Sequence, residues 1–337
     1  MSARVSSRSF LPSVPDPLVS ILIPCHNAGA FLDATLGSAF AQTWPRCEII
    51  LVDDGSTDDS VARARAWESR GLRMFTQPNR GASAARNAAL RAARGEFIQY
   101  LDADDLLAPT KIERQLARAR SAPAGAVFTG RWGRFTARTE ETVFPDANPL
   151  FADLAPRDYL LRYGSQDCMM HPAAWLLPRA LAERTGPWDE RLSLNDDGEY
   201  FARVVTQATA IVHCGDAVSY YRSALSTSLS AQRRRRHLDS AYLSLTSITE
   251  KMLAFENTAA MRRAAADLHQ RFAYDYYPAA PDLVELALRR AAALGGSSLR
   301  PLGGKVFQAL SRIIGWRAAR RWQVRLGKFP APAADEP

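Results

Sequence analysis

No apolar run in this 337-residue chain reaches the roughly 18 residues that a membrane-spanning helix needs. The four cysteines lie far apart and form neither a CxxC pair nor a knuckle with histidine, which excludes a zinc ribbon and a disulfide scaffold. The chain also lacks GxxxxGK[ST] and a GxGxxG motif after a strand, so neither glycine-rich phosphate loop is available. Its first residues contain no apolar segment typical of a secretory signal. These absences favour a cytoplasmic protein with reduced thiols.

The charge of the chain is unevenly distributed. Apolar residues make up 47% and charged residues 23%, which suits a folded core and excludes a disordered chain. Lys and Arg number 43 against 35 Asp and Glu, and a net charge of +8 is typical of binding to nucleic acid or an anionic membrane. Residues 233–328, however, hold 18 Lys and Arg against 7 Asp and Glu, a balance of +11, and the rest is at −3. Because no RNA- or DNA-binding motif accompanies this excess, we expect no nucleic-acid partner.

Strand and helix patterns alternate from Leu18 onward. Buried strands are predicted at 18–23, 47–52, 72–77 and 96–101, and helical patterns at 31–40, 58–70 and 82–93 separate them. This alternation predicts an α/β sheet of mostly parallel strands, whose ligand crevice lies past the carboxyl ends of the strands. Short strands are predicted next at 126–130, 208–214 and 217–222, and only helices after about 236.

Four segments follow from these patterns. Residues 1–16 and 329–337 are expected to be loose tails. Residues 17–230 are expected to form the α/β domain, and residues 231–328 a basic helical region.

Two carboxylates follow the fourth predicted strand in LDADD, residues 101–105. Asp102 and Asp104 are two residues apart on an extended segment, so their side chains point to the same side. Carboxylates at the mouth of an α/β crevice suit Mg²⁺ or Mn²⁺, which binds one or two carboxylates together with substrate phosphates. The alternative is a solvated turn that caps the following helix.

Two further segments carry candidate nucleotide-binding residues. In VDDGSTDDS, residues 52–60, Asp54 is placed to accept a hydrogen bond from a base N–H, although a turn with a helix cap explains the segment as well. In NRGASAARNAAL, residues 79–90, Arg86 can reach a phosphate or hold the acidic loops in place. Its alternative is a surface arginine on an alanine-rich helix.

The later part of the predicted domain contains a second acidic pair. Asp196 and Asp197 begin a predicted helix in NDDGEYFAR, where a carboxylate can act as general base on an acceptor hydroxyl or simply cap the helix. In SYYRSALSTSLS, residues 219–230, Arg222 and the serines after it either cover a bound diphosphate or form a polar loop.

Taken in order, VSILIPCHN, FAQTWPRCEIILVDDGSTDDS, NRGASAARNAAL, GEFIQYLDADD, NDDGEYFAR and the YYR…S loop resemble glycosyltransferase family 2 over residues 18–230. The resemblance implies a GT-A fold, a Rossmann-like α/β fold with a mixed, mostly parallel sheet flanked by helices, here with a C-terminal helical extension. It also implies an inverting transfer from a nucleotide-diphosphate-sugar, expected to be a UDP-sugar, with Mg²⁺ or Mn²⁺. The residues implied for donor binding are Pro24, His26, Asn27, Asp54, Arg86, Asp102 and Arg222. Those implied for the metal are Asp104 and Asp102, and the implied base is Asp197, with Asp196 as the alternative.

The sequence departs from the family pattern at two places. His26 stands where a tyrosine is usual, and the usual Glu-Asp base motif is Asp196-Asp197, in which alignment on Arg203 favours Asp197. The QxxRW motif of processive synthases is absent, since Ala318 stands where the glutamine would be, so we expect a single sugar transfer.

The basic C-terminal region contains an amphipathic segment, residues 303–328. Val306, Phe307, Leu310, Ile313 and Ile314 recur at helical spacing and arginines and two tryptophans accompany them, a pattern typical of helices on a membrane surface. The alternative is a helix packed on the α/β domain with solvated arginines. We expect a glycan or lipid-linked acceptor in cell-surface glycan or glycolipid synthesis, and a location in the cytoplasm at the inner face of the plasma membrane.

Two other functions stay open at this point. A sugar nucleotidyltransferase on a related scaffold would favour a glycine-rich basic loop near the N-terminus, which the sequence does not contain. A nucleic-acid-binding protein is suggested by the basic segment QRRRRH alone.

Overall fold

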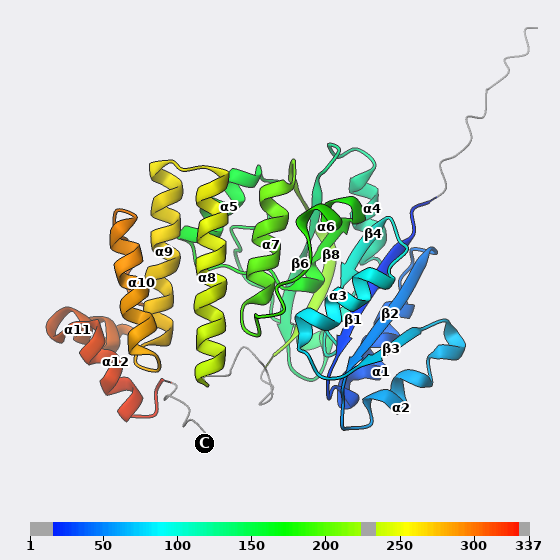
Figure 1. Ribbon diagram of the computed structural model, residues 1–337, viewed down its shortest axis with the longest axis horizontal. Helices are drawn as coiled ribbons and strands as arrows, with labels where there is room; N and C mark the ends of the chain where they lie inside the picture. The colour runs from blue at the N-terminus through cyan, green and yellow to red at the C-terminus, as the bar shows by residue number, and fades with distance from the viewer. Residues whose placement is uncertain (1–15, 224–233, 330–337) are drawn as a thin grey trace, which may run out of the picture.

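The computed structural model describes residues 16–223 and 234–329. Within these residues an eight-stranded mixed sheet carries helices on both faces, and further helices stand beside one end of it (Figure 1). Residues 1–15 of the tail predicted at 1–16 and residues 330–337 of the tail predicted at 329–337 lie outside the described residues. So does the segment 224–233, which contains the serines that follow Ser223 in the predicted loop.

The sheet runs in the order β3-β2-β1-β4-β7-β6-β8-β5. Its first four strands are parallel, as the alternating pattern predicts, and β7 and β5 join the remaining strands in antiparallel pairs. The strands are β1 (Val19–Cys25), β2 (Cys47–Asp54), β3 (Arg73–Gln77), β4 (Phe97–Tyr100), β5 (Leu106–Leu107), β6 (Val127–Phe135), β7 (Trp175–Pro178) and β8 (Ile211–Arg222).

The helices fall into a group that covers the sheet and a group at the C-terminal end. The first group is α1 (Gly29–Phe40), α2 (Ser60–Arg65), α3 (Ala82–Ala92), α4 (Lys111–Ala119), α5 (Pro156–Ser165), α6 (Arg179–Thr185) and α7 (Asp196–Gln207). The second group is α8 (Arg235–Phe255), α9 (Ala259–Tyr276), α10 (Pro281–Ala293), α11 (Lys305–Ile314) and α12 (Trp316–Arg325).

The central strands are apolar on both faces because helices cover both faces. In β1, Ile21 and Ile23 pack with α1, α2 and α4, while Leu22 between them packs with α3, α6 and α7. All three side chains are fully buried. This explains why the sequence shows continuous apolar runs at these strands instead of an alternation of apolar and polar residues.

Two predicted strands and one predicted helix differ from the structure. The strands predicted at 208–214 and 217–222 form one strand, β8, because its pairing with β6 shifts register between Gly130 and Arg131 without breaking. A Cβ atom at Gly130 would lie 2.2 Å from the carbonyl oxygen of Ala217, so the shift needs a glycine there. The helix predicted over 58–70 is shorter, since α2 ends at Arg65 and a 3₁₀ turn follows.

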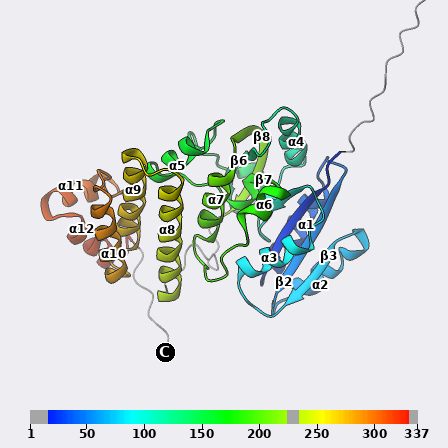
Figure 2. The same ribbon diagram turned by 45° about the horizontal axis from the view of Figure 1, so that its top comes forward.

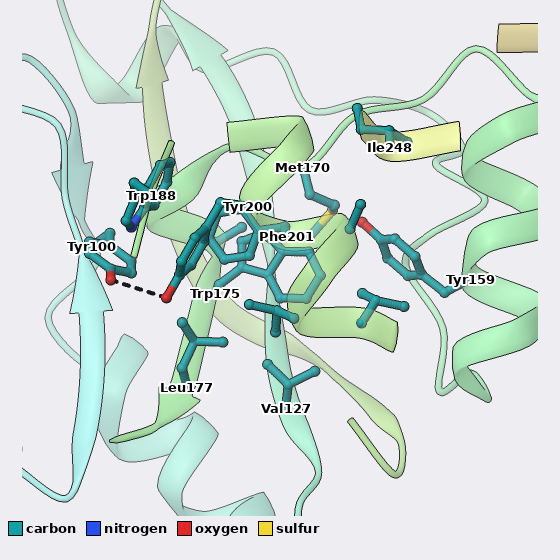
Figure 3. Close-up of a cluster of buried hydrophobic side chains, with 14 of the residues drawn as sticks. Tyr100, Val127, Tyr159, Met170, Trp175, Leu177, Trp188, Tyr200, Phe201 and Ile248 are labelled. Carbon is teal, nitrogen blue, oxygen red and sulfur yellow. Dashed lines mark hydrogen bonds between the residues drawn. The ribbon is translucent and has the colours of Figure 1, made fainter. Parts of the chain in front are cut away.

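Of the C-terminal helices, α8 packs on α7 and α9 packs on α5, while α10 packs on α9. Figure 3 shows Ile248 of α8 in one buried cluster with Tyr159 of α5, Phe201 of α7 and Trp175 of β7. The close approach of α5 to α9 requires Gly164, where a Cβ atom would lie 2.8 Å from the Ala264 carbonyl oxygen. Residues on both sides of the predicted boundary at 230 therefore share one apolar core.

Helices α11 and α12 lie at the end of the molecule opposite β2 and β3, as Figures 1 and 2 both show. Trp316 packs on Tyr274 and Tyr277, with ring centroids 4.9 and 5.3 Å apart, and Phe307 is buried. The rest of this pair is largely exposed. None of the helices in residues 16–223 and 234–329 has the length and apolar character to cross a bilayer.

Candidate active site

The candidate site lies where the loops after β1, β2 and β4 meet the start of α7. The first two loops are joined by Asn27, whose side-chain oxygen accepts a hydrogen bond from the Thr57 backbone N–H at 2.8 Å. Asn27 has a φ of 49°, a left-handed conformation that asparagine tolerates better than most residues. The imidazole Nδ1 of His26 lies 2.9 Å from the carbonyl oxygen of Asp54. Pro24 lies in buried β1 opposite Val52. The structure thus brings Pro24, His26, Asn27 and Asp54 together.

The N-terminus of α1 is closed by acidic side chains. The Gly29 backbone N–H donates to Asp58 Oδ2 at 3.0 Å, and a Cβ atom at Gly29 would lie 2.0 Å from Asp59 Oδ1. Dinucleotide-binding folds use this helix N-terminus to bind phosphate. Here two carboxylates occupy the position, in agreement with the missing GxGxxG motif.

Asp54 is buried and holds the loop that leads into α3. Its Oδ1 accepts from the Arg80 backbone N–H at 2.9 Å, and its Oδ2 accepts from the Gly81 backbone N–H at 2.7 Å. The Gln77 amide donates a third hydrogen bond at 2.7 Å. A carboxylate has about four acceptor positions, so one position is left for a base N–H.

Its neighbour Asp53 was missed by sequence reasoning. Asp53 is 3% exposed, and its Oδ1 has no hydrogen-bond partner within the described residues. The only signal in the sequence was a second acid in VDDGS. Both acids are buried, and their hydrogen bonds distinguish them, since both oxygens of Asp54 accept strong hydrogen bonds and Asp53 Oδ1 accepts none within the described residues.

Arg86 of α3 connects the two acidic segments. Its guanidinium donates to Asp102 Oδ1 at 2.7 Å and to Asp196 Oδ2 at 2.6 Å, and it lies 4.5 Å from the ring centroid of Trp188. Burial alone would lower the pKa of Arg86, but the two carboxylates outweigh burial and raise it. Arg86 is 5% exposed, so the surface-arginine alternative is wrong.

The DxD segment gathers carboxylates at the end of β4. Burial, followed by the charges of Asp105 and Asp102, raises the pKa of Asp104 to about 7. These residues do not cap a helix, because β5 follows at once and α4 starts only at Lys111, with Thr110 before it. The capping alternative is therefore wrong.

This donor set fits a hard divalent cation. Within residues 16–223 and 234–329 no group of three or more His, Cys, Asp or Glu side chains could hold a metal ion. Asp102 and Asp104 would supply two carboxylates to such an ion and would leave its other coordination positions to phosphate and water oxygens, the arrangement that Mg²⁺ prefers.

The acidic pair at the start of α7 divides into two different environments. Asp196 is paired with Arg86 and accepts a hydrogen bond from Ser83 Oγ at 3.2 Å. Asp197 lines a small pocket with Tyr159, Tyr163 and Met170. Burial, together with the charge of Asp196, raises the pKa of Asp197 to about 7. A general base works best with a pKa near the operating pH, so Asp197 has the better environment for that role.

Arg222, at the end of β8, contacts the DxD segment from the other side. Its Nε donates to the carbonyl oxygen of Asp104 at 2.9 Å, and its NH1 donates to the carbonyl oxygen of Thr136 at 2.9 Å. Its guanidinium lies over the rings of Phe31 and Phe135. In this structure it fixes the acidic loop, and its predicted contact with a diphosphate stays a prediction.

A hydrogen-bonded Ser–His–Asp network, which no sequence pattern predicted, lies directly behind the DxD segment. Asp105 Oδ2 lies 3.1 Å from His171 Nδ1, and His171 Nε2 lies 2.9 Å from Ser219 Oγ. All three residues are at most 1% exposed, so Ser219 cannot reach a substrate as a nucleophile. They come from three separate elements, and no local pattern could have found them.

Comparison with known proteins matches the part of the chain that carries Asp54, Arg86, Asp102 and Asp104 to a family. Residues 20–185 match the family described as Glycosyl transferase family 2. The Escherichia coli UDP-Glc:alpha-D-GlcNAc-diphosphoundecaprenol beta-1,3-glucosyltransferase WfgD is 35% identical over 30% of this chain and 41% of its own length. The matched segment spans less than half the length of three other curated relatives: 41%, 30% and 46%.

Two solved structures share the fold. The structure of S. aureus TarS 1-349 in complex with UDP-GlcNAc matches with a TM-score of 0.69 and 18% identity, over 93% of each chain. Mannosyltransferase PcManGT from Pyrobaculum calidifontis, in complex with GDP-Man and Mn2+, matches with a TM-score of 0.54 and 20% identity, over 93% of this chain and 84% of its own. At these identities the likeness establishes the fold alone.

Proposed function

Because the chain belongs to glycosyl transferase family 2, we propose that it moves one sugar from a nucleotide-diphosphate-sugar to an acceptor hydroxyl with inversion at the anomeric carbon. The observation that carries this proposal is the position of Arg86 between Asp102 and Asp196. One guanidinium holds the metal-binding candidate and the start of the base-bearing helix together, and Asp197 lies beside this pair.

The proposed donor is a UDP-sugar. Pro24, His26, Asn27 and Asp54 lie together at the carboxyl ends of β1 and β2, where open α/β sheets bind their ligands. The UDP-GlcNAc complex of TarS, which has the same fold, supports this assignment.

Asp102 and Asp104 would hold a Mg²⁺ or Mn²⁺ ion. Such an ion neutralises the negative charge that grows on a leaving diphosphate. The Mn2+ complex of PcManGT supports a divalent ion in this fold. Arg86 donates to Asp102 Oδ1 at 2.7 Å and so keeps Asp102 in place for that ion.

Asp197 is the proposed general base. It removes the proton from the acceptor hydroxyl while that oxygen bonds to the anomeric carbon and the bond from this carbon to the diphosphate breaks. General-base assistance is typically worth about 10²–10⁴-fold. Asp196 is engaged by Arg86 and orients the start of α7 without taking the proton.

Release of nucleoside diphosphate from sugar nucleotides tests this function. We expect release to require Mn²⁺ or Mg²⁺ and to fall more than about 100-fold in Asp104→Ala, because stabilisation of the diphosphate charge is worth several kcal/mol. Asp216→Asn is the matched control, since this exposed aspartate pairs only with Arg114 at the surface. Pyrophosphate release from a nucleoside triphosphate and a sugar phosphate, without sugar transfer, would instead establish a nucleotidyltransferase.

The proposed acceptor is lipid-linked and is reached at the cytoplasmic face of a membrane. The name of WfgD, an enzyme that acts on a diphosphoundecaprenol-linked sugar, supports this class of acceptor. Helices α11 and α12 supply the proposed membrane contact, which we call the terminal surface. Its large apolar side chains are between 46% and 79% exposed: Leu302, Val306, Ile313, Ile314, Trp322 and Leu326. Exposed basic residues lie among them: Lys305, Arg312, Arg321 and Arg325.

Vesicle co-sedimentation tests the membrane contact. We expect the full chain to bind vesicles of anionic phosphatidylglycerol more tightly than vesicles of phosphatidylcholine, because apolar insertion and charge attraction add. Ile313→Glu combined with Trp322→Glu should abolish this binding. Val143→Glu is the matched control, since Val143 is 71% exposed but lies outside the terminal surface. Unchanged binding in the double variant would contradict the membrane contact and leave the sugar transfer intact.

A further inference from the structure

We propose that the buried chain Asp105–His171–Ser219 holds the DxD loop in the shape that binds the cation, which makes His171 a positioning residue for the metal site. This inference rests on the proposed function, because it assigns the cation to Asp102 and Asp104. It adds residues from β8 and from the segment before β7 that neither the sequence motifs nor the family match identifies.

The Asp105–His171–Ser219 network begins one residue after Asp104, the candidate metal ligand. Asp105 follows Asp104 directly, but its carboxylate points into the protein and is 0% exposed. Its Oδ1 accepts a hydrogen bond from the Arg222 backbone N–H at 2.8 Å, and its Oδ2 lies 3.1 Å from His171 Nδ1. Both carboxylate oxygens of Asp105 are therefore occupied within the protein.

His171 is itself fixed from all sides. Its Nε2 lies 2.9 Å from Ser219 Oγ on β8, so both ring nitrogens have a partner. The rings of Trp132 and Tyr221 surround the imidazole, with centroids 5.5 and 5.4 Å away. His171 has no access to substrate, so it acts on the site only through Asp105.

The same region of β8 also holds the backbone of the DxD loop. Arg222 Nε donates to the Asp104 carbonyl oxygen at 2.9 Å, and β5, which follows Asp105, pairs with β8 through Leu106 and Tyr220. Asp102, Asp104 and Asp105 lie within four residues and repel one another when charged. Inward anchoring of Asp105 keeps its carboxyl group away from the side chains of Asp102 and Asp104.

Loss of the His171 contact would free Asp105 to rotate out of its pocket and displace Asp104. Replacing a residue that orients a metal ligand in this way typically lowers the metal affinity about 10–100-fold. We expect the same range for this loop.

Direct Mn²⁺ binding, measured by calorimetry on the full chain without donor, tests the proposal. His171→Phe keeps the ring among Trp132 and Tyr221 but removes both polar contacts, and it should raise the Mn²⁺ Kd about 10–100-fold. Ser219→Ala leaves the Asp105 contact and should raise the Kd by a smaller factor. His171→Asn places an amide where Nδ1 lies, which can bond to Asp105, and should restore most of the affinity.

His213→Phe is the matched control. His213 is also on β8 and stacks on Phe151, but its Nδ1 contacts Thr129, away from the DxD loop. We expect no change in Mn²⁺ affinity for this variant.

The outcomes separate this proposal from the function on which it rests. If the wild type binds Mn²⁺ and folded His171→Phe and Ser219→Ala bind it equally well, the positioning role is wrong and the proposed transferase stands. If the wild type binds no Mn²⁺ even with UDP present, the metal assignment itself fails, and the positioning role fails with it. If His171→Phe does not fold, the Mn²⁺ Kd values of Ser219→Ala and His171→Asn decide. A raised Kd in Ser219→Ala, with a Kd near that of the wild type in His171→Asn, supports the positioning role, and a wild-type Kd in Ser219→Ala overturns it.

Discussion

At the scale of single residues, the site depends on Arg86. This arginine is buried, and both of its carboxylate partners come from other elements, with Asp196 lying 110 residues further along the chain. Removing either carboxylate would leave the buried guanidinium without a counter-charge, and removing the guanidinium would leave two partly buried carboxylates unpaired. Either change destabilises the folded protein. The same contact makes Asp196 and Asp197 chemically different although they are neighbours.

Arg86→Met should lower the free energy of unfolding by about 3–5 kcal/mol, because it leaves Asp102 and Asp196 without their shared cation. Arg91→Met on the exposed face of the same helix should change it by less than about 0.5 kcal/mol. Urea unfolding followed by circular dichroism measures both variants. An equal, small loss for the two would mean that Arg86 is not required as a buried partner.

The pKa of Asp197 predicts opposite effects on activity and stability. Its pKa is raised to about 7, so the basic form appears as the pH rises through 7, and kcat/KM should fall about tenfold per pH unit well below that value. Because the folded state holds this proton more tightly than the unfolded state, the group destabilises the protein as the pH rises from about 4 to 7.

Asp197→Asn should therefore be inactive yet have a higher Tm than the wild type at pH 8. The difference in Tm should shrink as the pH falls to 4, where the wild-type carboxyl is protonated in the folded state and about half protonated in the unfolded state. Calorimetry at the two pH values measures it. A variant that is less stable at pH 8 would show that Asp197 is a structural cap and not a base.

At the scale of elements, much of the site depends on how strands and loops meet. Helix α1 has no side-chain cap of its own, and Asp58 from the next loop accepts its Gly29 N–H. Strand β8 runs through what the sequence predicts as two strands, since its shifted pairing with β6 occurs at Gly130. The far end of that strand carries Ser219 and Arg222 to the DxD loop, so the register shift helps to set the position of the site.

Gly130→Ala should lower the free energy of unfolding by about 1–3 kcal/mol, because the new Cβ atom would lie 2.2 Å from a backbone oxygen that cannot move freely. Gly215→Ala on the partner strand is the control, since its nearest atom would lie 3.8 Å away. Thermal and urea unfolding compare the two. Equal stability of both variants would contradict a requirement for glycine at the shift.

At the scale of the whole molecule, the α/β region and helices α8–α10 form one core. Ile248 and Met252 of α8 belong to the same buried cluster as Tyr100 of β4 and Trp175 of β7. The boundary near residue 230 thus separates two kinds of secondary structure but not two apolar cores. The terminal surface lies at the far end of this block, away from β2 and β3 (Figure 2).

Ile248→Ala should lower the free energy of unfolding by about 2–5 kcal/mol, since the side chain is 1% exposed and its removal leaves a cavity. Calorimetry should show one transition, moved as a whole to lower temperature. Leu286→Ala, at a position 48% exposed on α10, should leave the temperature of this transition unchanged. Two transitions of which only one moves would show that the α/β region and the C-terminal helices unfold independently.

The sequence by itself determined the features that are encoded within a few residues. Apolar runs separated by helical patterns predicted the parallel strands from β1 to β4. The acids that follow a strand marked Asp102 and Asp104 as candidates, and those at the start of a predicted helix marked Asp196 and Asp197. Side-chain periodicity and turn chemistry are local, so they can be read without knowledge of the fold.

The tertiary structure alone decided what those residues contact. The pairing of Arg86 with Asp196, the orphaned oxygen of Asp53 and the burial of His171 between Asp105 and Ser219 join segments that lie far apart in the chain. Such contacts depend on strand order and register, which set the neighbours of each loop and which no short pattern encodes. The carboxylates were therefore predictable, whereas their partners, and with them the assignment of roles, required the fold.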